Sequence, residues 1–219
     1  MLQNAPEWDK SLFYAVNGWR SGLFDTVMPV FSLTWVLWAL ALAAFAVWIV
    51  LALRHKDKRR HFKAILFGMA LFLVTSGVTD LVTLAVKSGM GRARPYQTLP
   101  LVHYKTKSHW HKNPADFTPI PHRADSFFSG HAAHSMAAAV TVATLCPPLS
   151  PVIYAMPLVV GYSRMYMGRH YPSDVLAGWL AGACVALLAR RLTRGIRRKL
   201  GMENPALQSG REPVRAISL

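Results

Sequence analysis

The chain has 219 residues, of which 53% are hydrophobic and 16% are charged, and its mean hydropathy is +0.24. Soluble domains carry roughly a quarter charged residues, so this balance argues against a soluble protein and favours one integral membrane domain over residues 1–219. The net charge of +15 does not indicate a nucleic-acid partner, because the basic runs at 54–63 and 190–199 directly follow apolar stretches, where lysine and arginine set membrane topology.

The chain begins with a mixed segment that is followed by two long apolar stretches. Residues 1–25 combine aromatic side chains with basic ones, which is typical of a helix lying in the membrane interface; a short water-exposed helix is the alternative. Residues 26–53 contain no charged side chain, and residues 64–86 are interrupted only by Asp80. Both stretches reach the roughly 20 residues needed to cross a bilayer, so we expect a first and a second span here.

Three further spans are expected in the second half of the chain. Residues 131–162 contain no lysine, arginine, aspartate or glutamate, and the prolines of 147–151 divide them into a third and a fourth span. Residues 175–189 form a shorter fifth span. The predicted fold is therefore all-α: a polytopic membrane helical bundle with about five transmembrane helices and an N-terminal interfacial helix.

Basic residues are concentrated beside span ends on one side only. Five spans place the run at 54–63 and the tail at 195–219 in the cytoplasm and the N-terminus outside. The outer face then receives residues 87–130, including a long loop at 96–128, and the connection between the fourth and fifth spans. Every polar cluster of the sequence is expected on this outer face.

The first polar cluster follows the second span. Lys87, Arg92 and Arg94 supply three cations within eight residues, and the neighbouring glycines let the backbone approach a bound group. Lysine as a point charge and arginine as a fork both suit phosphate. The alternative is a set of basic side chains that extend from a helix end to the headgroups.

The second polar cluster opens the third span. A helix N-terminus presents unpaired N–H groups and partial positive charge, so Ser129, Gly130 and His131 are placed to bind an anion. Plain helix capping is the alternative, although capping does not require a histidine. His134 is interpreted as a lining or interfacial residue.

The third polar cluster lies between the fourth and fifth spans. Arg164 and Arg169 are followed by His170, and Ser173 with Asp174 resembles the start of a helix. In the bland interpretation His170 is a surface histidine. In the functional one, Asp174 accepts a hydrogen bond from one ring nitrogen of His170 and leaves the other nitrogen free to act as a nucleophile or a base.

These clusters, in this order, resemble the three signature motifs of the type 2 phosphatidic acid phosphatase superfamily of lipid phosphatases. The resemblance covers about residues 80–190, and Phe128 is a departure, since the second motif usually has proline there. The matching residues are Lys87 with Arg94 and Pro95, then Ser129, Gly130 and His131, then Ser163, Arg164, His170 and Asp174.

The resemblance implies a role for each matching residue. His170 would be the nucleophile that forms a phosphohistidine, Asp174 its orienting partner, and His131 the general acid. The implied phosphate ligands are Lys87, Arg94, Ser129, Gly130 and Arg164. Members of this family need neither metal nor cofactor, so none is expected.

Other polar residues have weaker assignments. Asp80 is expected to be a structural partner of the basic site, because an ionisable residue inside a span needs a partner. Arg92 and Arg169 are candidate headgroup contacts. The loop at 96–128 carries four histidines without a standard metal-binding spacing, so headgroup selection or a lid is the preferred role and a metal site the minor one.

Taken together, the sequence predicts a multi-pass protein of the bacterial inner membrane that hydrolyses a terminal lipid phosphate on the periplasmic side. The expected substrates, in order, are undecaprenyl pyrophosphate, phosphatidylglycerophosphate, phosphatidic acid and lipid A 1-phosphate. Transfer of the phosphate to another lipid, or non-catalytic binding and transport of an anionic lipid, are the alternatives. The sequence leaves the oligomeric state open.

Overall fold

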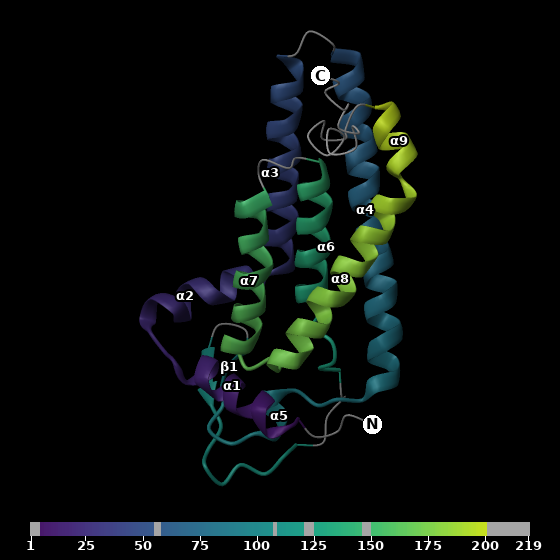
Figure 1. Cartoon of the computed structure of the whole chain (residues 1–219). Helices are drawn as coiled ribbons and strands as arrows, with labels where there is room; N and C mark the ends of the chain where they lie inside the picture. Colours follow the sequence, from purple (N-terminus) through teal and green to yellow (C-terminus); the bar gives the residue numbers. More distant parts are fainter. Residues whose placement is uncertain (1–4, 55–57, 107–108, 121–124, 146–149, 201–219) are drawn as a thin grey trace, which may run out of the picture.

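The computed structural model describes residues 5–54, 58–106, 109–120, 125–145 and 150–200. Five long helices run alongside one another, and most of the short elements, but not α9, gather at one end of them (Figure 1). The long helices are α3 (Thr34–Leu53), α4 (Lys58–Met90), α6 (Gly130–Leu145), α7 (Ser150–Tyr166) and α8 (Pro172–Leu192). The short elements are α1 (Glu7–Gly18), α2 (Gly22–Phe31), α5 (Pro95–Thr98), α9 (Arg194–Lys199) and the strands β1 (His103–Thr106) and β2 (His109–Lys112).

The most extensive helix packing among the described residues joins α6 to α8. A Cβ atom on Gly182 would lie 2.0 Å from the backbone oxygen of Ala133, and one on Gly178 would lie 2.5 Å from that of Ser129. Two glycines four residues apart thus let the α8 backbone rest directly on α6, a packing device typical of membrane helices. This contact sets the distance between the first residues of α6 and those of α8.

The described residues contain two helical segments long and apolar enough to cross a membrane, His61–Thr98 and Pro172–Leu192. A third candidate is the pair Gly22–Phe31 and Thr34–Val50, whose two helices meet at 68°. Helices α6 and α7 have 16 and 17 residues. The helical bundle is confirmed, whereas the number of five crossings stays a prediction.

The first predicted span, 26–53, is not one straight helix. It is broken between α2 and α3, and hydroxyl groups bind the backbone beside the break: Ser163 Oγ donates to the Met28 carbonyl at 2.5 Å and lies 2.6 Å from Ser32 Oγ. Because side chains satisfy polar groups at this point, a predominantly apolar segment can bend here.

Within the predicted interfacial helix, 1–25, the described residues form α1 and the beginning of α2, and α1 is docked on the end of the bundle. Phe13 is fully buried in a cluster with Val102 and Tyr171. Asn17 donates to the carbonyl oxygens of His103 and Tyr166 at 2.8 and 2.9 Å. Packing and hydrogen bonds therefore join α1 to the bundle.

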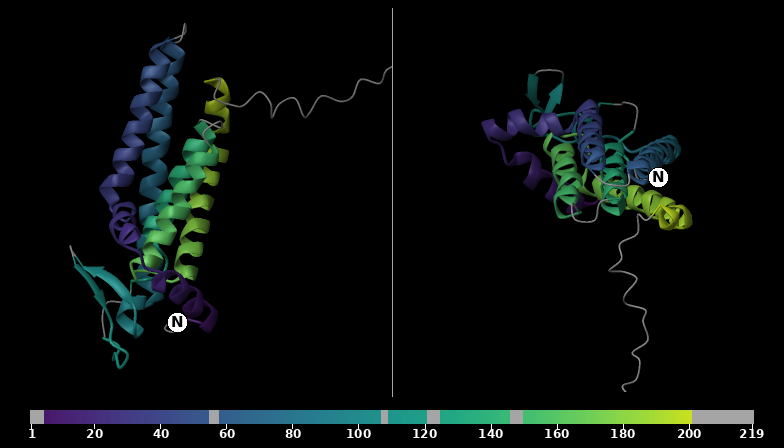
Figure 2. Two further views of the ribbon diagram at one scale, coloured as in Figure 1. Left: turned by 90° about the vertical axis from the view of Figure 1, so that its left-hand side faces the viewer. Right: turned by 90° about the horizontal axis from the view of Figure 1, so that it is seen from above.

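The predicted outer loop, 96–128, contains all of α5 but its first residue and an antiparallel hairpin of β1 and β2, in which His103 is opposite Lys112. Asn113 ties the segment together, because its side-chain amide donates to the carbonyls of Tyr96 and Leu99. The hairpin projects from the end of the bundle that carries α1 (Figure 2).

The two ends of the bundle differ in character. The beginning of α4 and the basic helix α9 lie at one end, while α1, α5 and the hairpin lie at the other (Figure 1). This agrees with the prediction that the basic segments lie on one side and the polar clusters on the other. Residues 147–149 of the proline turn predicted at 147–151, and residues 201–219 of the tail predicted at 195–219, lie outside the described residues.

Candidate active site

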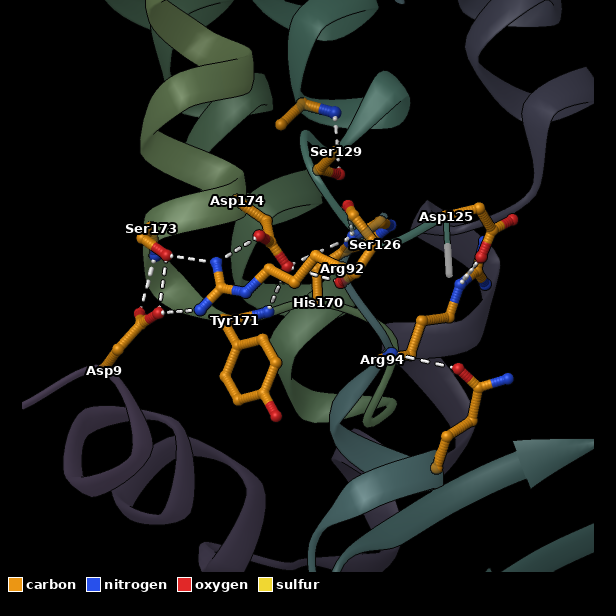
Figure 3. Close-up of polar contacts among 12 residues, drawn as sticks. Asp9, Arg92, Arg94, Asp125, Ser126, Ser129, His170, Tyr171, Ser173 and Asp174 are labelled. Atoms are coloured by element: carbon orange, nitrogen blue, oxygen red, sulfur yellow. Dashed lines mark hydrogen bonds and ion pairs between the residues drawn. The ribbon is translucent and has the colours of Figure 1, made fainter. Parts of the chain in front are cut away.

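The three polar clusters of the sequence meet at the end of the bundle that carries α1. Lys87 lies in the last turn of α4, and its charge interacts with those of Arg94, Arg164 and Asp174. His131, in the first turn of α6, interacts with Arg164 and His170. The fold thus brings the expected catalytic and phosphate-binding residues into one site, part of which is shown in Figure 3.

His170 lies in the turn between α7 and α8 and is only 2% exposed. Its Nδ1 is 2.9 Å from the carbonyl oxygen of Ser126. A carbonyl only accepts hydrogen bonds, so Nδ1 carries a proton and Nε2 of the neutral ring has a free lone pair. Burial lowers the pKa of His170 to about 4, although the nearby Asp174 carboxylate acts in the opposite direction.

Asp174 does not form the predicted hydrogen bond with His170, since its Oδ2 lies 3.7 Å from Nδ1. This oxygen instead accepts from Ser126 Oγ at 2.6 Å and from the Tyr171 backbone N–H at 2.9 Å. The second bond caps the start of α8. Asp174 therefore reaches the histidine through Ser126 and not directly. Asp174 orients Ser126, and the Ser126 carbonyl orients His170 (Figure 3).

Arg164 is a buried cation with hydrogen-bonding capacity to spare. Its side chain leaves the last turn of α7 and is 8% exposed, and its Nε has no hydrogen-bond partner among the residues described. Gly130, the first residue of α6, adds one of the N–H groups that a helix leaves without an internal acceptor. Both groups are suited to an anion. Ser129 instead uses its N–H to bind the Asp174 carbonyl at 2.9 Å.

Arg94 is held by a residue that the sequence patterns did not reveal. Its Nε and Nη2 donate to the two carboxylate oxygens of Asp125 at 2.8 and 2.9 Å. Burial alone would raise the pKa of Asp125, but the hydrogen bonds and charge of Arg94 outweigh it, so this pKa lies below its ordinary value. A carboxylate therefore occupies the fork expected to bind phosphate.

Arg92 and Arg169, the candidate headgroup contacts, are both engaged by other groups of the protein. Arg92 is 3% exposed and donates to Asp174 and to Asp9, both at 2.6 Å. Arg169 donates to the Lys105 carbonyl at 2.6 Å and thereby supports the hairpin. Burial lowers the pKa of Arg169. Both arginines are internal braces in this structure, because carboxylates or carbonyls already engage their guanidinium groups.

Asp9 is the second residue missed in the sequence. Its only visible signal was a carboxylate in the first turn of an otherwise amphipathic helix, which is common on helix surfaces. Asp80, expected to support the basic cluster, instead lies 3.0 Å from Nε2 of His134. The two side chains connect α4 with α6 outside the cluster of cations.

The histidine-rich loop shows no metal-binding arrangement where it is described. No group of three or more histidine, cysteine, aspartate or glutamate side chains converges within 5–54, 58–106, 109–120, 125–145 and 150–200. His122 lies outside those ranges. The expectation of a metal-free site therefore remains one for experiment.

The fold and the site define a class: a helical membrane protein that collects two histidines and several cations at one end of its bundle. Residues 65–198 match the model of the PAP2 superfamily, and the chain belongs to this family. The match covers the three polar clusters and begins after α1, α2 and α3.

Curated relatives include an undecaprenyl-diphosphatase of Sulfolobus acidocaldarius, 40% identical over 29% of this chain and 32% of its own length. A lipid A 1-phosphatase of Rhizobium etli is 32% identical over 54% of this chain and 47% of its own length. The match thus spans about a third to a half of these relatives. The undecaprenyl-diphosphatase BcrC of Bacillus subtilis is 24% identical over 83% of this chain and 82% of its own length.

Two solved structures share the fold. LpxE of Aquifex aeolicus has a TM-score of 0.63 at 19% identity, over 87% of this chain and 99% of that one. The PAP2-type phosphatidylglycerolphosphate phosphatase of Bacillus subtilis has a TM-score of 0.57 at 20% identity, over 87% of each chain. At this identity the likeness concerns the arrangement of helices.

Proposed function

We propose that the protein is a metal-independent lipid phosphate phosphatase that acts through a phosphohistidine. The observation that carries the proposal is the buried His170, held neutral with a free Nε2 within the electrostatic reach of Arg164 and Arg94. A nucleophile beside fixed cations is the combination that phosphoryl transfer requires, since the cations stabilise charge on the phosphoryl oxygens.

The reaction proceeds in two displacements. Nε2 of His170 attacks phosphorus, the bond from phosphorus to the leaving oxygen breaks, and His131 gives that oxygen a proton. His131 then takes a proton from water, whose oxygen attacks phosphorus and releases inorganic phosphate and free His170. The proposed phosphate ligands are Lys87, Arg94, Arg164, Ser129 through its hydroxyl, and the Gly130 N–H.

The proposed substrate is a membrane lipid with a terminal phosphate, and undecaprenyl pyrophosphate is the first choice. Two of the relatives above bear the name undecaprenyl-diphosphatase, and another is named for the 1-phosphate of lipid A. We place the protein in the bacterial inner membrane with the site facing the periplasm. The basic segments at the opposite end of the bundle support this orientation.

Purified protein in detergent, incubated with EDTA and a panel of lipid phosphates and diphosphates, tests the proposal by release of inorganic phosphate. We expect release with EDTA present and the highest kcat/KM for the polyprenyl diphosphate. Loss of activity with EDTA would contradict the metal-free mechanism. Phosphate that appears on an added lipid alcohol, and not in solution, would identify a phosphotransferase that uses the same intermediate.

The acid side of the pH profile should report the low pKa of His170. The ring attacks only when neutral, and burial keeps it neutral down to about pH 4. The fall in kcat/KM on acidification should therefore come well below pH 6.5, the ordinary histidine value. Profiles for two substrates whose phosphates have different pKa values distinguish a pKa of the enzyme from a pKa of the substrate. A midpoint near 6.5 that is common to both would contradict the prediction.

Replacement of Asp125 by asparagine should strengthen substrate binding. The Asp125 carboxylate accepts hydrogen bonds from both Nε and Nη2 of Arg94. A phosphate has to displace this carboxylate before Arg94 can bind it. We expect D125N to lower KM by roughly three- to tenfold, the scale of one charge-assisted hydrogen bond at a partly exposed site. Kinetics with a soluble short-chain lipid phosphate measure this. Asp116→Asn in the same loop is the control, and a higher KM in D125N would show that Asp125 positions Arg94 for the substrate.

A further inference from the structure

A buried arginine connects the N-terminal helix to the catalytic turn. One end of the Arg92 guanidinium donates to Asp174 Oδ1 at 2.6 Å and to Ser173 Oγ at 2.7 Å, and the other end donates to Asp9 Oδ2 at 2.6 Å. Its carbon lies 4.3 Å from the centre of the Tyr171 ring. Arg92 is thereby fixed at both ends and on one face (Figure 3).

Asp9 is held as firmly as Arg92. The side chain is fully buried, Oδ1 accepts from the Ser173 backbone N–H at 2.8 Å, and Oδ2 accepts from Ser173 Oγ at 2.5 Å. Its contacts thus lie on the first turn of α8, beside Asp174. A buried carboxylate is costly unless its hydrogen bonds are satisfied, and here every one of these bonds comes from the active-site end of the bundle.

The charges of this group do not cancel. Asp9 and Asp174 carry two negative charges against the single positive charge of Arg92, so the cluster has one net negative charge. Asp174 Oδ2 lies 3.7 Å from His170 Nδ1, which makes this ring the neighbour that experiences the excess. Water is largely excluded, because the side chains of Asp9, Arg92 and Asp174 are at most 3% exposed, and this strengthens the interaction.

The proposed reaction creates a positive charge at that position. When Nε2 of His170 binds phosphorus while Nδ1 keeps its proton on the Ser126 carbonyl, the imidazole ring becomes cationic. If Arg92 were paired with Asp174 alone, the charge of that carboxylate would be cancelled. With Asp9 on its other end, Arg92 is neutralised elsewhere and Asp174 remains negative beside the ring.

We propose that Asp9, on the N-terminal helix, is a positioning residue for phosphoryl transfer that keeps Asp174 available to His170 by neutralising Arg92. The inference rests on the proposed function. It adds a residue outside 65–198, the part of the chain that matches the family model. The helix α1 is accordingly a part of the active site, and Asp9 acts on the chemistry without touching the substrate.

Asp9→Asn in the full-length protein tests the proposal, because asparagine keeps the shape and the hydrogen bond to the Ser173 N–H but removes the charge. We expect kcat to fall by about 10- to 100-fold, the scale of one lost electrostatic contact in an active site, and KM to change by less than about threefold. Orthovanadate forms a five-coordinate adduct with the nucleophile, so its inhibition constant should rise by about the factor by which kcat falls. Inhibition by inorganic phosphate should stay constant.

Two further variants separate this role from simple support of the fold. Glu7→Gln removes a charge from the exposed side of the same helix and should retain the parent kcat. Arg92→Gln with Asp9→Asn restores one net negative charge, so the double variant should turn over faster than Asp9→Asn alone. A double variant slower than Asp9→Asn, or orthovanadate and phosphate inhibition weakened equally in Asp9→Asn, would overturn the proposal.

The activity of the parent enzyme in the same assay distinguishes a failure of the proposed function from a failure of the role proposed for Asp9. A parent that releases no phosphate from any lipid of the panel overturns the proposed function itself. An active parent together with an equally active Asp9→Asn overturns only the role of Asp9. If the Arg92 variants fail to fold, the comparison of orthovanadate with phosphate in Asp9→Asn decides by itself.

Discussion

Replacement of His170 by alanine is expected to abolish phosphate release while lipid binding survives. The substitution removes the nucleophile but none of the cations. Among the contacts described, the one hydrogen bond that His170 donates goes to the Ser126 carbonyl. The expected loss in kcat is about 10⁴-fold or more, the range found when a nucleophile or its base is removed. Release of inorganic phosphate and retention of a fluorescent lipid phosphate by the purified variant measure the two properties.

His111→Ala is the matched control for His170→Ala. His111 belongs to the hairpin, where its Nε2 lies 2.7 Å from Thr106 Oγ1 and its ring stacks on Tyr104. We expect near-parental turnover from this variant. A His170→Ala protein that turns over lipid phosphate at the parental rate would refute the phosphohistidine mechanism. A strong loss in His111→Ala would instead direct attention to the histidine-rich loop.

Gly182→Ala should have the largest effect on the fold. The added methyl group would lie 2.0 Å from the Ala133 backbone oxygen, which cannot move as a flexible side chain can. Helices α6 and α8 then have to separate, at a cost of roughly 1 to 3 kcal/mol or more for overpacking. Separation also moves His131 away from His170. We therefore expect a lower thermal midpoint in detergent together with a lower kcat.

Gly77→Ala provides the comparison for Gly182→Ala. Gly77 lies within α4, and a Cβ atom there has no neighbour within 4 Å outside the local backbone. The substitution should be neutral or slightly stabilising, because alanine has a higher helix propensity than glycine. Equal melting temperatures for Gly182→Ala and the parent would mean that the contact between α6 and α8 yields without cost.

The sequence was most informative where chemistry is local. Apolar runs indicated the helices, and the order of the three polar clusters predicted that Lys87, His131 and His170 meet at one site. The pair Gly178 and Gly182 is a further local signal, four residues apart on one helix face, from which the tight contact with α6 could have been predicted. Such patterns depend on neighbours along the chain.

Contacts between distant segments could not be predicted in this way. Asp9 and Asp125 are single carboxylates without a motif, and their arginine partners lie 83 and 31 residues away. The bond from His170 goes to a backbone carbonyl, which every residue possesses, so no side-chain pattern marks it. The hydroxyl that binds the backbone beside the bend between α2 and α3 likewise comes from Ser163, far along the chain.

The burial of Asp9 against the start of α8 has a consequence for biogenesis. Asp9 and Ser173 are 164 residues apart, which at roughly 5 to 20 residues per second means a delay of roughly 10 to 30 s between the synthesis of one and of the other. Until α8 is inserted, Asp9 lacks the two hydrogen bonds from Ser173 and Arg92 lacks the one to Asp174, so docking α1 early would bury polar groups that are only partly satisfied. Stable docking of α1 on the bundle is therefore expected only after α8 has been made, because α8 supplies Ser173 and Asp174.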